Sequence, residues 1–274
     1  MEHETEPVDI NLKKELIQIL SVIKDFCDKN NIRYFLAYGT LLGSIRHKGF
    51  IPCDDDIDLW MPRPDYLTFI NTFKHDIYQF HCPEKDPFWP LNYGKVCDER
   101  FSAMDQFGND FGVFVDIFPL DGVPENKISI RVFQKHIRLL EHLWSNQLFS
   151  KTLHVSRKNG FTLNLKILTA KLIGLFFPYI AIRISLDKLY QKYNYDNARQ
   201  ISVLSDRQIV FNKKGFEPCI FSNFEGLQCR IPNDYHLFLT MLYEDYMTPP
   251  KDVSSTHGLV LKRKGELQKE PLTY

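Results

Sequence analysis

The chain has 274 residues, enough to bury a full hydrophobic core as one large domain or as one domain with a sizeable insertion. Hydrophobic residues make up 44% and charged residues 25%, which is typical of globular proteins and argues against a disordered chain. Basic and acidic residues both number 34, so no overall positive charge points to nucleic-acid binding, and any phosphate must be held by a local cluster of cations.

The cysteines and the amino terminus bear on the compartment. The six cysteines are scattered, without a Cys-x-x-Cys pair or a Cys/His spacing typical of zinc sites. Free thiols in a reducing compartment are therefore expected rather than disulfides. The first residues are acidic and polar, unlike a signal peptide. We expect a cytoplasmic protein, and peripheral contact with the inner face of the membrane stays an open alternative.

The predicted elements begin with alternating helices and strands. Hydrophobic periodicity and turn residues predict, in order, a helix over 9–29, a strand over 33–38, a short helix over 40–47, a turn at 48–52, an acidic strand that Pro62 ends, and a helix over 65–73. The remaining elements are short strands within 77–118, helices over 127–149 and 161–195, short strands near 219–231, and a helix over 233–246. This order predicts an α/β (α+β) core followed by a mostly helical second part.

One apolar segment lies inside the predicted helical part. Residues 172–182 read LIGLFFPYIAI without a charge, and Lys166, Lys171 and Arg183 flank them. The run is too short to span a bilayer, which needs about 20 apolar residues, and a proline interrupts it. A helix pair buried in the core is the favoured interpretation. The alternative is a basic-flanked apolar surface over 161–195 that rests on a membrane or receives a lipid-linked acceptor.

The most informative segment is residues 54–58, which hold four carboxylates in five positions beside an apolar run. Unpaired buried charges cost several kcal/mol each, so such a cluster usually holds a cation. In a strand, Asp54, Asp56 and Asp58 would share one face and Ile57 would point to the other. Oxygen ligands suit Mg²⁺ or Mn²⁺, so the segment predicts a metal-dependent phosphotransfer site.

Gly39 and Thr40 lie where the strand over 33–38 meets the next helix. Free backbone N–H groups at a helix start suit a phosphate, Gly39 allows positive φ and close approach, and Thr40 adds a hydroxyl donor. Alone, this pair would be an ordinary helix start. Followed by an acidic strand, it gives the order strand, Gly-[Gly/Ser/Thr], helix, Asp-x-Asp strand, which resembles the nucleotidyltransferase superfamily.

Longer blocks resemble the LicD/fukutin-related phosphotransferases. They cover residues 39–43, 46–52, 54–58, 112–121 and 246–250. Cys53 stands where the family usually has tryptophan, next to the predicted metal site. The resemblance implies a nucleotidyltransferase-like mixed sheet with a helical insertion. We expect a catalytic core over 1–125, a helical region facing membrane or acceptor over 126–200, and a part over 201–274 that completes the site.

The resemblance also implies an activity. The family is associated with moving phosphocholine, or a related phospho-alcohol, from a CDP-activated donor such as CDP-choline to a hydroxyl of a glycan. The acceptor would be a precursor of lipopolysaccharide, capsule or teichoic acid, free or lipid-linked. Asp56 and Asp58 match the metal-binding and catalytic positions, and Asp116 is the candidate for the third carboxylate and for the general base on the acceptor hydroxyl. A structural ion pair with an arginine is the alternative role for Asp116.

The candidate substrate-binding residues are Gly39, Thr40, Gly43, Arg46, Lys95 and His257. Arg46 has the planar fork that suits a phosphate. Lys95 is either a second phosphate clamp or an exposed lysine at a strand end, and His257 either contacts ligand or is merely exposed in a polar loop. A choline group favours an aromatic cage, but the abundance of aromatic residues leaves the cage unassigned.

Two other functions stay open. One is a nucleotidyltransferase that adds NMP to a small acceptor and releases pyrophosphate, where the CDP-alcohol reaction would release CMP. The other is a non-catalytic module that binds a glycan or a membrane. Aspartates retained at every motif position weigh against the non-catalytic module, because a site without catalysis has no need of unpaired carboxylates.

Overall fold

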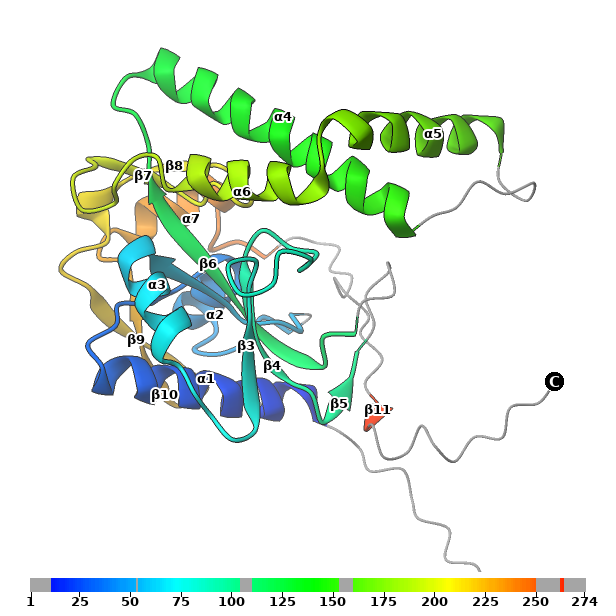
Figure 1. The fold of residues 1–274 in the computed structure, drawn as a ribbon. Coiled ribbons are helices and arrows are strands. Elements are labelled where there is room, and N and C mark those ends of the chain that lie inside the picture. Colours follow the sequence, from blue (N-terminus) through cyan, green and yellow to red (C-terminus); the bar gives the residue numbers. More distant parts are fainter. Residues whose placement is uncertain (1–10, 53, 104–109, 153–159, 250–261, 264–274) are drawn as a thin grey trace, which may run out of the picture.

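The computed structural model of the protein describes residues 11–52, 54–103, 110–152, 160–249 and 262–263. The central sheet contains, in spatial order, β1 (Phe35–Leu36), β2 (Asp58–Pro62), β6 (Val113–Gly122), β4 (Gly94–Asp98) and β3 (Tyr78–His81). Two further strands extend it from the end of β6, namely β7 (Gln200–Ser202) and β8 (Val210–Asn212) (Figure 1). The sheet is mixed, since β2 and β6 are parallel and the other pairs antiparallel. The expected mixed α/β fold is therefore confirmed.

Strand β6 is the central element of this sheet. Its first half pairs with β4, its middle with β2, and its last two residues with β7. Nearly every residue of β6 is buried, as expected for a strand flanked on both sides and covered on its faces. The same strand therefore connects the interior of the sheet to the β7–β8 extension.

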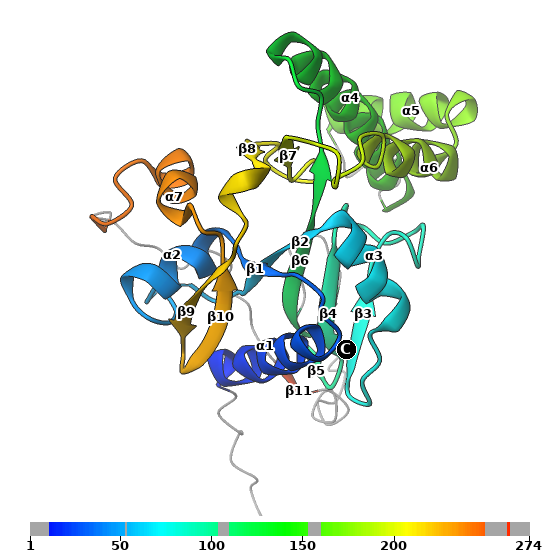
Figure 2. The same cartoon turned by 90° about the vertical axis from the view of Figure 1, so that its left-hand side faces the viewer.

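Helices and a hairpin surround the sheet. They are α1 (Leu12–Lys29), α2 (Tyr38–Arg46), α3 (Arg63–Thr72), α7 (Tyr235–Tyr243), and the hairpin of β9 (Ile220–Phe224) and β10 (Leu227–Ile231). Helix α1 lies against β6 and β4 and buries residues at helical spacing, including Leu16, Ile19 and Ile23, as its periodicity predicts. A separate short pair joins β5 (Phe101–Ser102) to β11 (Lys262–Arg263). Figure 2 shows the hairpin and α7 beside α2, on the side of the sheet away from β3.

A helical part stands beyond the carboxyl end of β6. It consists of α4 (Lys127–Thr152), α5 (Phe161–Phe176) and α6 (Tyr179–Tyr190), and Figures 1 and 2 show these helices as a layer apart from the sheet. Apolar residues of α4 and α6, such as Ile137 and Leu186, form a hydrophobic cluster distinct from the core around the sheet. The division of the chain at residues 125 and 200 into functional parts stays a prediction.

The predicted acidic strand is wrong in its first half. Strand β2 begins at Asp58, so Asp54 and Asp56 precede it in a loop, where the Asp54 N–H donates to the Ile51 carbonyl at 2.9 Å. The physical reason is that β2 is an inner strand, and consecutive carboxylates within it would be buried beside β6. Pairing starts at Asp58, one residue before the apolar run begins.

The described residues include five of the six cysteines. The five cysteines among them are free thiols: Cys27, Cys82, Cys97, Cys219 and Cys229. No single helix in the described segments has the length and apolar content needed to cross a bilayer. Residues Phe161–Gly174 and Tyr179–Tyr190 satisfy length and composition only as a pair, and the pair is bent by 75°.

A buried ion pair fixes α3 to the end of β6. Arg63 opens α3 and donates from Nε and Nη2 to the Asp121 carboxylate at 2.6 and 2.7 Å, and from Nη1 to Glu84 at 3.0 Å. Burial raises the pKa of Asp121 to about 6, although the neighbouring charge of Arg63 lowers it. The ionised Asp121 carboxylate therefore depends on Arg63.

We expect Arg63→Ala to lower the free energy of unfolding by about 3–5 kcal/mol, because it leaves buried carboxylates without their cation. Urea denaturation monitored by circular dichroism measures the change. The matched control is Arg199→Ala, which removes an exposed arginine 3.6 Å from Glu125 and should cost less than about 1 kcal/mol. Equal losses in the two variants would contradict the structural role given to Arg63.

Candidate active site

A row of three charged side chains crosses the sheet where β2, β6 and β4 lie side by side. Asp58 is the register partner of Asp116, and Asp116 is the register partner of Lys95. Directly opposite residues point to the same face, on strands about 4.8 Å apart. The Lys95 Nζ lies 2.5 Å from Asp116 Oδ1, and these two residues are only 3% and 6% exposed. We call Asp58, Asp116 and Lys95 the charged row.

The loop before β2 brings more negative charge to this row. Loss of hydration raises the pKa of Asp58 well above its usual range, and the charges of Asp56 and Asp116 raise it further. Lys95 opposes the rise, whereas Asp54 adds to it. Four carboxylates thus surround one ammonium group, and this arrangement favours the binding of a further cation.

The start of α2 is fixed to the start of β2. The Thr40 hydroxyl accepts a hydrogen bond from the Asp58 N–H at 2.9 Å, and Thr40 is only 1% exposed. A Cβ placed on Gly39 would lie 2.8 Å from Asp54 Oδ2, so glycine is needed for a carboxylate to pack there. The positive φ that Gly39 would allow is found instead at the preceding Tyr38, the first residue of α2, where φ is 40°.

Two predicted substrate contacts lie farther along α2. A Cβ on Gly43 would meet the Gly49 carbonyl oxygen at 2.4 Å, so this glycine lets the following turn pack against the helix. Arg46 donates from Nη1 to the Tyr246 carbonyl at 2.7 Å and thereby binds the segment after α7. The substrate-binding roles of Gly43 and Arg46 stay predictions, and His257 lies outside the described residues.

Lys95 is not an exposed lysine at a strand end, so that alternative is wrong. Its ammonium group is buried against Asp116 and lies 3.3 Å from the centre of the Phe114 ring. The ion pair considered as the alternative role of Asp116 is present, with a lysine in place of the arginine. Because the pair lies inside the charged row, it belongs to the site rather than to a remote part of the core.

The loop between β7 and β8, residues 203–209, also lies beside the site, although the sequence did not predict it there. This β7–β8 loop carries Arg207, whose guanidinium lies 4.9 Å from the centre of the Tyr38 ring. Burial raises the pKa of Tyr38, and the charge of the adjacent Asp206 adds to the rise. Burial also raises the pKa of Tyr243 to about 12, and the charge of Arg207 lowers it while the carboxylates beside β2 raise it. A polar Asp-Arg dipeptide between two strand-forming runs was the available signal.

The helical part holds this β7–β8 loop in place. Gln134 of α4 donates to the Gln208 carbonyl, and Arg138 Nε donates to the Gln208 side chain at 3.1 Å. Gln208 in turn donates to Glu141 Oε2 at 3.3 Å, and the Tyr190 hydroxyl of α6 donates to Glu141 Oε1 at 2.7 Å. The position of Arg207 beside Tyr38 therefore depends on polar contacts from α4.

The residues of the site fit a hard divalent cation in donor type and charge. Asp56, Asp58 and Asp116 supply only oxygen donors, and burial, together with the neighbouring negative charges, raises the pKa of Asp58. Within the part of the chain that the structure describes, no three His, Cys, Asp or Glu side chains are already grouped as ligands. The assignment of these aspartates to Mg²⁺ or Mn²⁺ stays a prediction.

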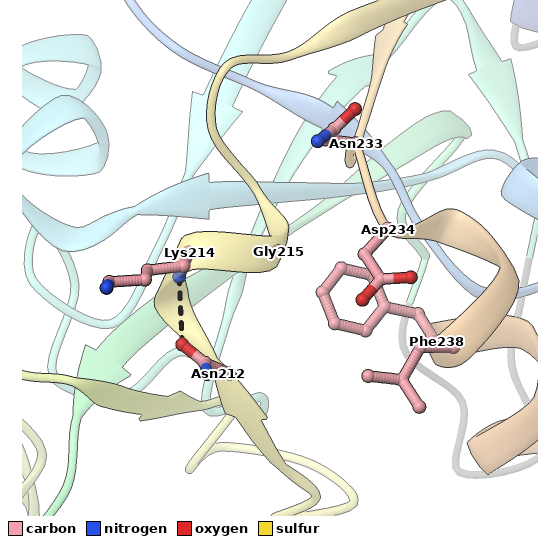
Figure 3. A pocket seen from close by; sticks show the side chains of 7 residues that line it. Asn212, Lys214, Gly215, Asn233, Asp234 and Phe238 are labelled. Carbon is pink, nitrogen blue, oxygen red and sulfur yellow. Dashed lines mark hydrogen bonds between the residues drawn. The ribbon is translucent and has the colours of Figure 1, made fainter.

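A surface hollow elsewhere contains none of these carboxylates. It has a volume of about 300 Å³ and lies between the turn after β8 and the start of α7. Figure 3 shows Asn212 and Lys214 on one side of it and Asp234 and Phe238 on the other. The Asn212 side chain accepts a hydrogen bond from the Lys214 N–H at 3.1 Å, which stabilises the turn. We therefore place the candidate active site at the charged row.

A mixed sheet that presents carboxylates beside a Gly-Thr helix start has the fold and site of a nucleotidyltransferase-type protein. Residues 31–163 match the family model described as LicD/FKTN/FKRP, nucleotidyltransferase domain. The chain is 32% identical to the lipopolysaccharide cholinephosphotransferase LicD of Haemophilus influenzae, over 91% of this chain and 97% of that protein. An uncharacterised Rickettsia typhi protein is 32% identical over 38% of this chain and 37% of its own. The chain belongs to the LicD family, and the resemblance seen in the sequence is confirmed.

The contacts of the β7–β8 loop generate a pH prediction. Burial raises the pKa of Glu141 to about 7 from a usual value of 4.5, although the Tyr190 hydrogen bond and the Arg138 charge lower it. Between these pH values the native state binds more protons than the unfolded state, so the free energy of unfolding falls as pH rises. We expect the Glu141 carboxyl to contribute a loss of roughly 1–3 kcal/mol across this window, and Glu141→Gln should remove that contribution.

Urea denaturation at several pH values between 4.5 and 8 measures this slope. The control is Glu125→Gln, which alters an exposed glutamate, 70% accessible at its side chain, and should keep the slope of the natural chain. A slope of undiminished size in Glu141→Gln would show that other groups, such as Asp121, cause it.

Proposed function

We propose that the protein transfers phosphocholine, or a related phospho-alcohol, from a CDP-activated donor to a hydroxyl of a surface-glycan precursor, with a divalent metal ion. The observation that carries this proposal is the charged row of Asp58, Asp116 and Lys95 at the Gly39–Thr40 helix start. Similarity to a lipopolysaccharide cholinephosphotransferase over most of both chains favours CDP-choline as donor and lipopolysaccharide as the first acceptor to test.

In the proposed reaction the charged side chains of the site act on the phosphate groups and on the acceptor hydroxyl. The acceptor hydroxyl attacks the phosphorus that carries choline, the bond to the CMP phosphate breaks, and the hydroxyl proton passes to a carboxylate of the site. Negative charge then gathers on phosphoryl oxygens, and Lys95 and Arg207 supply positive charge near them. Asp116 is our proposed base. A divalent cation held by Asp56, Asp58 and Asp116 would neutralise charge on the diphosphate.

Release of CMP tests the reaction directly. Purified protein, CDP-choline and Mg²⁺ are incubated with glycan acceptors from lipopolysaccharide, capsule and teichoic acid, and CMP and the modified glycan are quantified by chromatography and mass spectrometry. We expect CMP in equal amount to transferred phosphocholine. Pyrophosphate formed from a nucleoside triphosphate, without CMP from CDP-choline, would instead identify a nucleotidyltransferase that adds NMP.

Replacing Asp58 or Asp116 by asparagine should lower kcat/KM for CMP release by about 10²–10³-fold or more, because each change removes a charge aimed at the reacting phosphate or its cation. Chelation with EDTA should abolish release, and added Mg²⁺ should restore it. The control Asp76→Asn changes an exposed carboxylate outside the site and should retain full activity. Full activity in folded Asp58→Asn or Asp116→Asn protein would place the active site elsewhere.

Arg207 should bind the donor diphosphate. Replacement by alanine should raise KM for CDP-choline about tenfold or more, since a charge-assisted hydrogen bond contributes about 1.5–3 kcal/mol. Arg207→Lys should recover only part of this loss, because lysine lacks the bidentate fork. Arg199→Ala, which removes an exposed arginine at the edge of β7, is the matched control and should leave KM unchanged. An unchanged KM in Arg207→Ala would remove Arg207 from the donor site.

A further inference from the structure

Helix α5 presents a continuous apolar stripe to solvent. The stripe consists of Phe161, Leu165, Leu168, Leu172 and Phe176, which are between 49% and 81% exposed. At 100° per residue these positions fall within an arc of about 80°, so they form one face of the helix. The interpretation of this segment as a helix pair buried in the core is therefore wrong for α5.

The opposite side of α5 is the side that packs. Ile167 is fully buried, and a Cβ on Gly174 would lie 2.3 Å from the Gln147 side chain of α4. Helix α5 contacts α4 through this side, and Figure 1 shows it at the edge of the helical part, away from the sheet. Packing on α4 therefore explains the buried side and leaves the apolar stripe without a structural role in the fold.

The charged residues on α5 beside the apolar stripe are all basic. Residues 161–176 include Lys166 and Lys171 and no aspartate or glutamate, and both lysines are exposed. On the helix they lie about 100–120° to either side of the centre of the stripe. In this position their aliphatic stems can follow an apolar surface while the ammonium groups reach a polar, negatively charged layer. Phe177 and Ile184, 53% and 48% exposed, continue the apolar surface toward α6.

We infer that this face of α5 rests on the surface of a bilayer that contains anionic phospholipids. An apolar stripe flanked by lysines, without acidic residues, complements acyl chains beside anionic headgroups. A second copy of the same face would instead bring lysines toward lysines. Helix α5 has 16 residues and the chain then bends by 75° into α6, a geometry suited to lying in the interface rather than crossing it.

This inference goes beyond the proposed reaction, because membrane binding requires neither donor nor metal. It also has a structural consequence for the site. Helix α4 carries α5 on one side and holds the β7–β8 loop through Gln134 and Arg138. A bilayer under α5 would therefore lie at a fixed orientation to Arg207 and the charged row.

Sedimentation with vesicles tests the inference on the full chain, without nucleotide or metal. Vesicles of phosphatidylcholine with about 30% phosphatidylglycerol are compared with pure phosphatidylcholine. We expect at least tenfold stronger partition onto the anionic vesicles. The double variant Leu168→Ser/Leu172→Ser should lose about tenfold or more of this binding, and Lys166→Glu/Lys171→Glu should lose the preference for anionic lipid.

The matched control is Ile77→Ser/Phe221→Ser, which removes two exposed apolar side chains, 41% and 58% accessible, from strand regions distant from α5. It should bind as the natural chain does, and circular dichroism should show unchanged folding in every variant. Equal partition onto both vesicle types, or full binding by folded Leu168→Ser/Leu172→Ser, would overturn the inference. So would a dimer in light scattering that this variant abolishes while vesicle binding is absent, since the stripe would then be a contact between copies.

Discussion

The placement of Asp58 and Asp116 at adjacent positions of two parallel inner strands is the constraint on which the site depends. The register forces two carboxylates within a strand spacing of each other in poorly hydrated surroundings, where like charges repel strongly. Lys95 limits that cost by pairing with Asp116 from the next strand. The Thr40 hydroxyl separately satisfies the backbone N–H of Asp58. The fold therefore maintains an arrangement that would be unfavourable without cations.

Strand β6 connects this arrangement to the rest of the molecule. Asp116 lies in the charged row, and five residues later Asp121 receives the Arg63 fork that holds α3. The last residues of β6 then pair with β7, which leads into the loop that carries Arg207. Gln134 of α4 donates to the Gln208 carbonyl of the same loop. The helical part is therefore connected to the sheet by this contact as well as by the chain itself.

Local patterns predicted α1, the apolar strand β6 and the Asp-rich segment before β2, because each depends on periodicity or on a contiguous motif. The burial of Lys95 follows from its register against Asp116, which lies on another strand, so it has no local signal. The place of Arg207 follows from the pairing of β7 with both β6 and β8, which the Asp-Arg dipeptide alone does not reveal. The prediction of a strand over the first half of the acidic segment was wrong, because the alternation of side chains takes no account of the cost of burying charges on an inner strand. The sequence left open whether α5 is buried or exposes an apolar surface, because apolar content does not reveal whether a partner covers each face.

The charge balance of the site also constrains how the proposed donor binds. A nucleoside diphosphate is anionic, and the carboxylates beside β2 would repel it at short distance unless positive charge lies between them. Lys95 is already engaged by Asp116, and Arg207 lies over the ring of Tyr38 at the start of α2. The protein's own cations therefore neutralise only part of the charge. In the proposed reaction a divalent cation held by the carboxylates would supply the remaining positive charge and so lower the electrostatic cost of binding the diphosphate.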